Sequence, residues 1–240
     1  MTSIRALIAA YDTDFNNRRI KEIHFDKSRI NKISKEVGYF KAVYDKYGFA
    51  LVESNADEID KLTLGTSHGG IIAITTDREI PQLDSECKIS ENGFYCMIQG
   101  IEDPYNFGYS LRSLYACGCD GIILPERNWM SAAGVVARSS AGSSERFPIF
   151  RADPIDAADY FKSLGYTIVC ADENTENVLG KCELKKPILL IVGGEKRGIS
   201  RALIEKSDML VKINYAREFK ASLSAASATT MFAYEIMRQN

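Results

Sequence analysis

The chain has 240 residues, 45% of them hydrophobic, and a formal net charge of -2. This composition is that of an ordinary globular protein with enough apolar side chains for a sizeable core, which excludes a disordered or fibrous chain. No apolar run reaches the roughly 20 residues of a membrane span, and the run near the N-terminus is too short for a signal or transit peptide. We therefore expect no membrane segment and a cytoplasmic location.

The near-neutral total conceals an uneven distribution of charge. Residues 5–46 carry ten Lys and Arg against six Asp and Glu, whereas residues 47–88 carry three against eight. A protein that binds a polyanion needs only a local basic patch, so the first stretch could face one. A solvated helical face explains the same charges, and the pattern alone favours this simpler interpretation.

The six cysteines form no CxxC pair and have no histidine at ligand spacing. Most of them lie inside apolar runs, where a free cysteine packs as a small hydrophobic residue. We expect free thiols in a reducing compartment, and no metal site.

Strand-like and helix-like runs alternate along the whole chain, which predicts an α/β fold with mainly parallel sheets. Residues 77–93 are polar, rich in turn residues and without a sustained period. We place a boundary there, between domains of residues 1–90 and 94–240. In the first domain the pattern predicts strands at 20–25, 50–53 and 70–75 and helices at 29–44 and 56–62.

The second domain is predicted to be a parallel sheet with connecting helices. Strands are expected at 94–99, 120–125, 166–170, 188–192 and 209–213, and helices at 108–117, 131–138, 154–164, 200–206 and 222–237. In open α/β sheets ligands bind beyond the carboxyl ends of the strands. The loops after residues 98, 124, 192 and 213 are therefore the places where we expect a site.

The first of three marked segments is Asn106-Phe-Gly-Tyr-Ser-Leu-Arg112. After the Asp103-Pro104 turn, Asn106 is predicted to cap a helix that carries Arg112. Gly108 in the first helical turn costs about 1 kcal/mol relative to alanine, which indicates close approach of another group to the backbone. The simpler alternative is a capped helix with an exposed arginine.

The second segment, Gly193-Gly-Glu-Lys-Arg-Gly198, follows directly on an apolar strand. Such a loop offers backbone N–H groups to a ligand, but it matches neither a Walker loop nor GxGxxG. A tight strand-to-helix turn is the alternative. Glu195 favours a functional loop, because a carboxylate held between glycines can orient an arginine or accept hydrogen bonds from a ligand.

The third segment covers residues 222–235 and begins with Ser222-Leu223-Ser224, which precede a helix whose first turns are almost wholly small residues. A serine-capped helix packed closely against a neighbour explains this pattern. The small residues also leave room for a bulky planar ligand, and the two interpretations are compatible.

Together and in this order, the segments resemble the motifs of the SpoU/TrmH family of SPOUT RNA methyltransferases. The resemblance covers residues 94–240, and the 140–145 segment is similar to the family's stretch between the first two motifs. The matching positions are Asn106-x-Gly108-x-x-x-Arg112, Gly193-x-Glu195-x-x-Gly198 before Asp208-x-x-x-x-Ile213, and Ser222-Leu223 leading to Tyr234-Glu235. The 65–69 segment, ahead of a strand, is similar to part of the small ribosomal-protein-like substrate-binding domain often found before the catalytic domain.

The resemblance implies a SPOUT domain with a deep trefoil knot, preceded by an RNA substrate-binding domain of residues 1–90. It implies a homodimer that transfers a methyl group from S-adenosylmethionine to a ribose 2′-hydroxyl of ribosomal or transfer RNA, without a metal. The implied catalytic residues are Asn106, Arg112, Glu195 and Ser224. The implied cofactor-binding residues are Leu124, Gly193, Gly194, Gly198, Ile213, Ser222 and Leu223.

In such a reaction Arg112 suits stabilisation of a developing alkoxide or a clamp on the adjacent phosphate. A guanidinium with a pKa above about 12 does not suit the role of base. Glu195 could hold Arg112, and Asn106 would fix the first loop. Ser224 stands where the family usually has asparagine, which leaves open a non-catalytic RNA-binding protein of the same fold. A nucleotide-binding α/β enzyme with a phosphate-cradling Gly193 loop is a further alternative.

Overall fold

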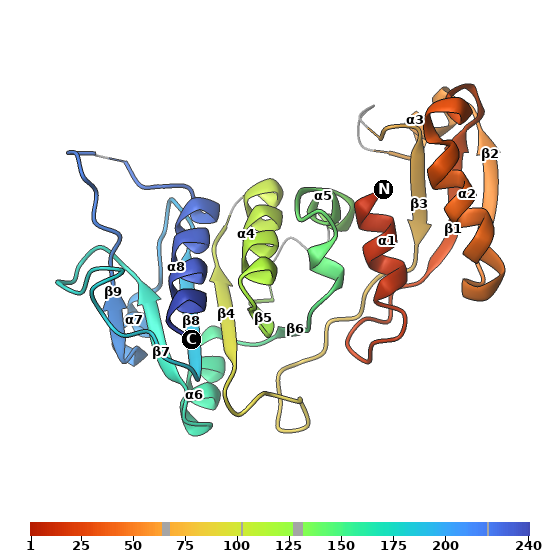
Figure 1. Cartoon of the computed structure of the whole chain (residues 1–240). Coiled ribbons are helices and arrows are strands. Elements are labelled where there is room, and N and C mark those ends of the chain that lie inside the picture. The colour runs from red at the N-terminus through yellow and green to blue at the C-terminus, as the bar shows by residue number, and fades with distance from the viewer. Residues whose placement is uncertain (64–67, 102, 127–131, 220) are drawn as a thin grey trace. The chain divides into compact units, whose positions relative to one another are not determined.

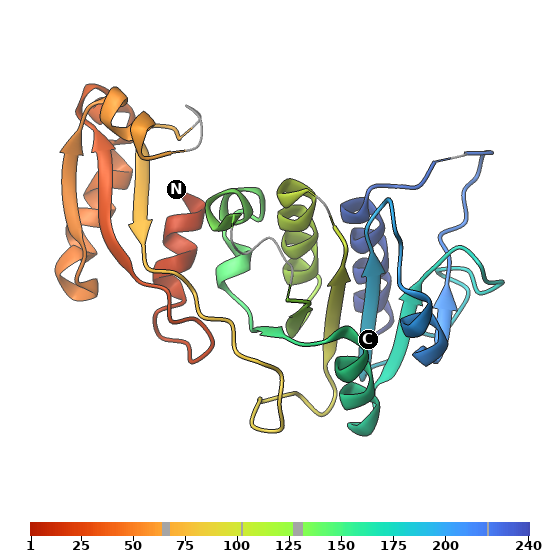
Figure 2. The same ribbon diagram turned by 180° about the vertical axis from the view of Figure 1, so that it is seen from behind.

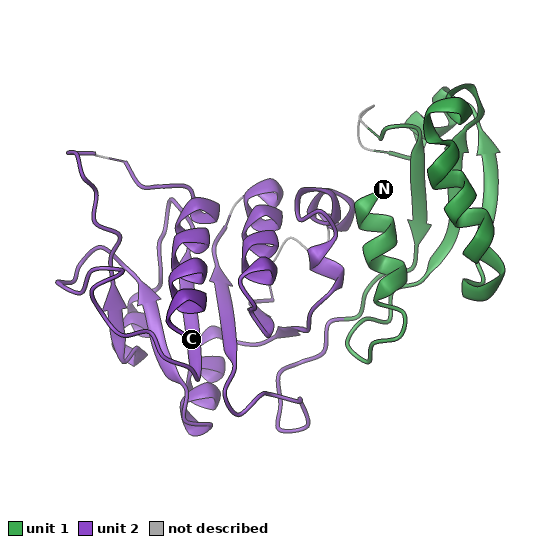
Figure 3. Cartoon of the chain, in the orientation of Figure 1, with its two compact units in different colours: residues 1–79 green, residues 80–240 purple. Residues whose placement is uncertain are grey.

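The chain divides into two compact units, residues 1–79 and 80–240 (Figure 3). The computed structural model describes residues 1–63, 68–101, 103–126, 132–219 and 221–240. The division falls inside the predicted boundary segment. Residues 80–90 nevertheless belong with the second unit, where the backbone N–H of Leu83 donates to the carbonyl of Arg151 at 2.8 Å.

The first unit is a three-stranded sheet with helices (Figure 1). Its strand order is β2-β1-β3, with β1 parallel to β2 and antiparallel to β3. The elements are α1 (Thr2–Ala9), β1 (Ile20–Asp26), a 3-10 turn (Lys27–Arg29), α2 (Ile30–Tyr47), β2 (Ala50–Ser54), α3 (Ala56–Lys61) and β3 (Ile71–Thr75). The strands and helices predicted for this unit are present, with bounds shifted by up to three residues. Helix α1 was not predicted.

Local sequence explains why α2 and α3 begin and end where they do. Buried Ile33, Val37 and Phe40 lie on one face of α2, at the spacing of a helix that packs on a core. The helix ends at Gly48, which has a left-handed φ of 71°. Helix α3 starts with a capping box, in which Asn55 and Glu58 exchange side-chain-to-backbone hydrogen bonds of 2.9 Å.

The second unit is a six-stranded, wholly parallel sheet with strand order β6-β5-β4-β8-β7-β9. The five strands predicted for it are confirmed. The short strand β6 was not predicted. The elements are β4 (Phe94–Gln99), α4 (Pro104–Ala116), β5 (Gly121–Leu124), α5 (Ala133–Ser139), a 3-10 turn (Ser143–Glu145), β6 (Ile149–Arg151), α6 (Pro154–Ser163), β7 (Thr167–Ala171), β8 (Ile188–Gly193), α7 (Arg201–Lys206), β9 (Met209–Val211) and α8 (Ala225–Gln239).

Both faces of this sheet are covered, so the unit has three layers (Figure 2). Alternate residues of a strand point to opposite faces. On β4, Cys96 packs with residues of α4, α5 and α8, whereas Met97 packs with residues of α6 and α7. Burial of one such large apolar side chain contributes about 1.5–3 kcal/mol. The continuous apolar runs of β4 and β8 follow from burial on both sides.

The cysteines are all free thiols, and three of them, Cys96, Cys119 and Cys170, are buried. Burial raises the pKa of the Cys170 thiol to about 12 and raises that of Cys96 well above its ordinary value. These groups therefore stay protonated and pack as apolar side chains.

Candidate functional site

The candidate site begins at the carboxyl ends of β4 and β8, which are neighbours in the sheet. The two loops that leave these ends are held together by Gln99. Its carbonyl accepts a hydrogen bond of 2.7 Å from the N–H of Gly194, and its side-chain oxygen accepts one of 3.1 Å from the N–H of Ser200. The loops after residues 98 and 192 thus meet, as the topology rule predicts.

Glycines are required in the second segment because the backbone packs against itself there. A Cβ atom added at Gly194 would lie 1.8 Å from the carbonyl oxygen of Gly100, and one added at Gly193 would lie 2.4 Å from the carbonyl carbon of Gly198. The N–H of Gly198 donates to the carbonyl of Gly194 at 2.9 Å, and Gly198 has a left-handed φ of 61°. The tight strand-to-helix turn, which the sequence offered as the alternative to a ligand-binding loop, is therefore present.

The side chain of Glu195 joins all three marked segments. Its Oε1 accepts a hydrogen bond of 3.1 Å from Nδ2 of Asn106, in the first segment. The same atom accepts a second bond of 3.1 Å from the backbone N–H of Ala225, the first residue of α8. A negative carboxylate is stabilised at a helix N-terminus by the helix dipole. Three segments far apart in the sequence thus meet at one oxygen atom.

The prediction that Asn106 caps the first helix is wrong. Helix α4 begins at Pro104 and is capped by Asp103, whose carboxylate accepts hydrogen bonds from the N–H groups of Tyr105 at 3.2 Å and Asn106 at 3.0 Å. Proline is favoured at the first helical position, so the helix starts one turn before the point expected from the sequence. This leaves the side chain of Asn106 free to donate to Glu195.

Gly108 permits a close approach, as expected, although it lies in the second turn of α4 and not the first. A Cβ atom added there would lie 1.8 Å from Oγ of Ser139 and 3.1 Å from the N–H nitrogen of Ser140. Both residues are at the end of α5. The group that approaches Gly108 is therefore the C-terminal end of α5 and not a ligand.

Arg112 lies on the exposed side of α4, in the same row as Tyr105 and Tyr109. It is six residues beyond Asn106, which at about 100° per residue turns it to a different face of the helix. Within the described part of the chain, no hydrogen bond or ion pair links Arg112 to Glu195. The partners of Glu195 are Asn106 and Ala225 instead.

The third segment begins with the cap of α8. Oγ of Ser224 accepts a hydrogen bond of 3.2 Å from the N–H of Ser227, and α8 starts at Ala225, later than predicted. Its small residues allow close packing on α4, where Oγ1 of Thr230 donates to Oγ of Ser113 at 2.6 Å. The predicted serine-capped, closely packed helix is confirmed.

The remaining predicted residues lie around the same edge of the sheet. Leu124 is buried at the end of β5, Ile213 is half-buried just beyond β9, and Ser222 is exposed. The N–H of Leu223 donates to the hydroxyl of Tyr215 at 3.3 Å.

A small pocket of about 50 Å³ opens at the centre of this arrangement. It is lined by Ile101, Asp103, Asn106, Glu195, Lys196 and Ala225. The sequence singled out neither Lys196 nor the carboxylate of Asp103 as part of a site. Asp103 could have been found from its place before Pro104, which is typical of a helix cap.

Within the described residues, no group of His, Cys, Asp and Glu side chains is arranged to hold a metal ion. No helix in the same part of the chain combines the length and apolar character needed to cross a membrane.

Residues 93–234, more than half of the chain, match the SpoU rRNA Methylase family. The chain belongs to this family. Proteins of the family are RNA methyltransferases, and the expectation drawn from the three motifs is confirmed at that level.

Two curated relatives illustrate the match. The chain is 28% identical over 199 residues to the putative TrmH family tRNA/rRNA methyltransferase YacO of Bacillus subtilis, covering 81% of this chain and 79% of that protein. It is 28% identical over 177 residues to a putative TrmH family tRNA/rRNA methyltransferase of Staphylococcus aureus, covering 72% of this chain and 71% of that protein.

Solved structures share the α/β fold with its parallel sheet. A crystal structure of an RNA 2′-O ribose methyltransferase matches with a TM-score of 0.80 at 21% identity, over 99% of this chain and 86% of that one. The SpoU methyltransferase AviRb from Streptomyces viridochromogenes, in complex with the cofactor AdoMet, matches with a TM-score of 0.76 at 22% identity, over 99% of this chain and 87% of that one.

Proposed function

We propose that this protein methylates a ribose 2′-hydroxyl of ribosomal or transfer RNA, with S-adenosylmethionine as the methyl donor. The observation that carries the proposal is the Glu195 carboxylate, which ties the three SpoU-like segments together at the carboxyl edge of the sheet. Relatives described as tRNA/rRNA methyltransferases and a structural neighbour described as a 2′-O ribose enzyme support the choice of substrate.

The cofactor is expected in the loops around this edge. Its proposed contacts are Leu124, Gly193, Gly194, Gly198, Ile213, Ser222 and Leu223. The residues present fit it, because the carboxylates of Asp103 and Glu195 line the pocket and suit a positively charged sulfonium group. When bound, S-adenosylmethionine supplies an electrophilic methyl group with a neutral thioether leaving group, a transfer that requires no metal ion. The AdoMet complex of AviRb supports the assignment.

The chain's own part in the reaction is to position and activate the ribose hydroxyl. Asn106 and Glu195 hold each other, so both polar groups enter the pocket already oriented. Ser224 holds the start of α8 by its cap and fixes the N–H of Ala225 toward Glu195. Arg112 is proposed to stabilise the developing alkoxide or to hold the adjacent phosphate.

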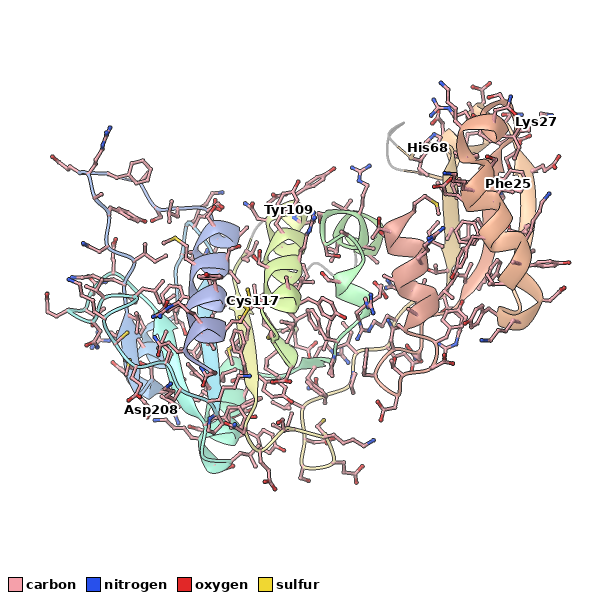
Figure 4. The ribbon with its side chains drawn as sticks, in the orientation of Figure 1. Phe25, Lys27, His68, Tyr109, Cys117 and Asp208 are labelled. Atoms are coloured by element: carbon pink, nitrogen blue, oxygen red, sulfur yellow. The ribbon has the colours of Figure 1, made fainter. Side chains whose placement is uncertain are left out.

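We further propose a homodimer in which Arg112 acts in the site of the partner subunit. On its own chain Arg112 lies on a different face of α4 from Asn106, in an exposed row with Tyr109. Tyr109, labelled on α4 in Figure 4, is 47% exposed. The neighbouring α8 exposes further large side chains, Met231, Tyr234 and Met237. Aromatic side chains and methionine gathered on two adjacent helices are typical of a protein interface.

The deep trefoil knot and the RNA-binding role of the first unit are also part of the proposal.

The RNA-binding role rests on a group of basic side chains. Exposed Lys27, Arg29, Lys32 and Lys35 gather at the start of α2, where the first turn has no acidic residue. Lys27 lies at the same end of this unit as His68 (Figure 4). Basic side chains next to a helix N-terminus attract phosphate groups. The free thiols are consistent with action in the cytoplasm.

The test is incubation of the protein with isotope-labelled S-adenosylmethionine and total RNA, followed by mapping of labelled riboses by mass spectrometry. Ribose methylation at a defined nucleotide is expected. Cofactor binding without labelled RNA in any preparation would overturn the catalytic proposal. Absence of cofactor binding at millimolar S-adenosylmethionine would favour a non-catalytic RNA-binding protein. Ser224, at a position where the family usually has asparagine, is the reason for testing this alternative.

A further inference from the structure

The segment between β9 and α8 carries two exposed aromatic rings that contact each other. Tyr215 is 38% exposed and Phe219 is 55% exposed. Their ring centroids are 5.7 Å apart, with an interplanar angle of 73°. Neither ring belongs to a hydrophobic cluster in the described part of the chain. A buried phenylalanine contributes about 1.5–3 kcal/mol, so leaving this ring in water forgoes a substantial stabilisation.

This aromatic pair, Tyr215 and Phe219, is linked to the candidate site. The hydroxyl of Tyr215 accepts a hydrogen bond of 3.3 Å from the N–H of Leu223. Leu223 is followed by Ser224, the cap of α8, and then by Ala225, whose N–H donates to Glu195. Residues 212–219 of the segment project beyond the carboxyl end of β9 (Figures 1 and 2). The rings thus stand at the edge of the sheet that carries the pocket.

The segment offers one exposed cation to a phosphate, Arg217, which is followed by the exposed acid Glu218. Arg217 lies between the two aromatic residues in sequence, is exposed, and has no ion pair within the described residues. A guanidinium binds phosphate oxygens in a bidentate manner. Sequence-specific recognition of RNA mostly uses unpaired bases that stack on aromatic side chains.

We infer that the aromatic pair is a stacking platform for an unpaired base of the RNA substrate, next to the ribose that accepts the methyl group, with Arg217 on a neighbouring phosphate. The inference rests on the proposed function, because it places the base beside the same site. It gives the segment between β9 and α8 a role in substrate selection, separate from the methyl-transfer groups at Glu195.

The test uses the full-length protein and a single-stranded RNA oligonucleotide that contains the fluorescent base 2-aminopurine, whose emission is quenched on stacking. Base stacking on an aromatic side chain contributes about 1–3 kcal/mol, so Phe219→Ala is expected to weaken oligonucleotide binding about tenfold. Quenching should be lost in this variant and retained in Phe219→Trp. Leu164→Ala is the matched control, since Leu164 is 42% exposed and lies at the end of α6.

Affinity for S-adenosylmethionine, measured by calorimetry, should be the same in Phe219→Ala as in the wild type. Unchanged oligonucleotide binding in Phe219→Ala, or wild-type binding without quenching, would overturn the inference. A loss confined to cofactor affinity would assign the pair to the cofactor and would also overturn it. Failure of the proposed function has a different signature, because the wild type would then bind and quench the oligonucleotide but methylate no RNA.

Discussion

Asn106 and Glu195 are 89 residues apart in the sequence and are joined by a hydrogen bond of 3.1 Å from Nδ2 to Oε1. The oxygen that accepts this bond also accepts one from the N–H of Ala225, so a single atom fixes the relative positions of the loop after β8, helix α4 and helix α8. Glu195 is exposed, so each of these hydrogen bonds contributes about 0.5–1.5 kcal/mol, the range of an ordinary bond. Glu195 therefore has a structural role as well as its proposed catalytic one.

Glu195→Gln separates these two roles. The amide oxygen still accepts hydrogen bonds from Asn106 and Ala225, so the fold is expected to survive with a loss of less than about 1.5 kcal/mol in the free energy of unfolding. Removal of the negative charge is expected to lower methyl transfer about 100-fold, the size of effect seen when an electrostatic catalytic group is removed. Thermal unfolding and single-turnover methylation measure the two effects.

The control for this variant is Glu205→Gln on α7, where Glu205 pairs with Arg201 at the surface. Such an exposed pair contributes about 0.3–0.5 kcal/mol, and turnover should not change. Equal methylation rates for Glu195→Gln and the wild type would contradict the catalytic role.

Gly194→Ala is expected to be strongly destabilising. Its Cβ would meet the carbonyl oxygen of Gly100 at 1.8 Å, and neither backbone can move without separating β4 from β8. Overpacking of this kind costs about 1–3 kcal/mol or more. Gly134→Ala in α5 is the matched control, since a Cβ there has no atom within 4 Å and alanine favours the helix by up to about 1 kcal/mol. Urea unfolding of both variants checks the prediction, and similar stabilities would contradict the packing seen at Gly194.

The sequence predicts the apolar strands and the loops at which they end, because burial on both faces of a parallel sheet leaves a continuous apolar run. It does not predict β6, because Ile149 and Phe150 are the only apolar residues of this strand, whereas the equally short β9 lies in the longer run of residues 209–213. It predicts the helix cap at Asn106 because Asp103-Pro104 is typical of a turn, whereas in the structure Asp103 caps the helix and Pro104 is its first residue. The order of the three segments predicts a common site, but no local pattern predicts that Glu195 contacts Asn106 and not Arg112. That contact depends on how α4, β8 and α8 pack.

Arg112→Ala should lower methyl transfer at least about 100-fold while cofactor affinity stays within a few-fold. Mixing this variant with Glu195→Gln tests the proposed dimer. If Arg112 of one chain serves the site that contains Glu195 of the other, each mixed dimer has one intact site. An equal mixture of chains should then recover about a quarter of the wild-type activity, because half of the dimers are mixed. No recovery would show that Arg112 and Glu195 act within one chain. Arg201→Ala, with a side chain 92% exposed on α7, is the control.

The hydrogen bonds of Glu235, near the C-terminal end of α8, are expected to make the free energy of unfolding depend on pH. Arg238 donates to both of its carboxylate oxygens, at 2.8 and 2.7 Å, and Nε2 of Gln239 donates to Oε1 at 2.6 Å. These hydrogen bonds lower the pKa of Glu235 from its ordinary value of 4.5 to about 2. Because the folded-state pKa lies below the unfolded one, this stabilisation is fully present above about pH 4.5 and is lost as the pH falls toward 2.

Gln239 extends the effect beyond α8. Its Oε1 accepts a hydrogen bond of 2.7 Å from the N–H of Leu184, so Glu235 helps to hold the segment before β8 against the end of the helix. Glu235→Gln should therefore be less stable than the wild type at neutral pH. The difference in the free energy of unfolding should shrink below pH 4.5, because the unfolded wild type takes up a proton there while folded Glu235 stays charged down to about pH 2. Urea unfolding of both proteins from pH 7 to pH 3 measures this difference. A difference that stays constant over the whole range would mean that the charge of Glu235 does not stabilise the fold.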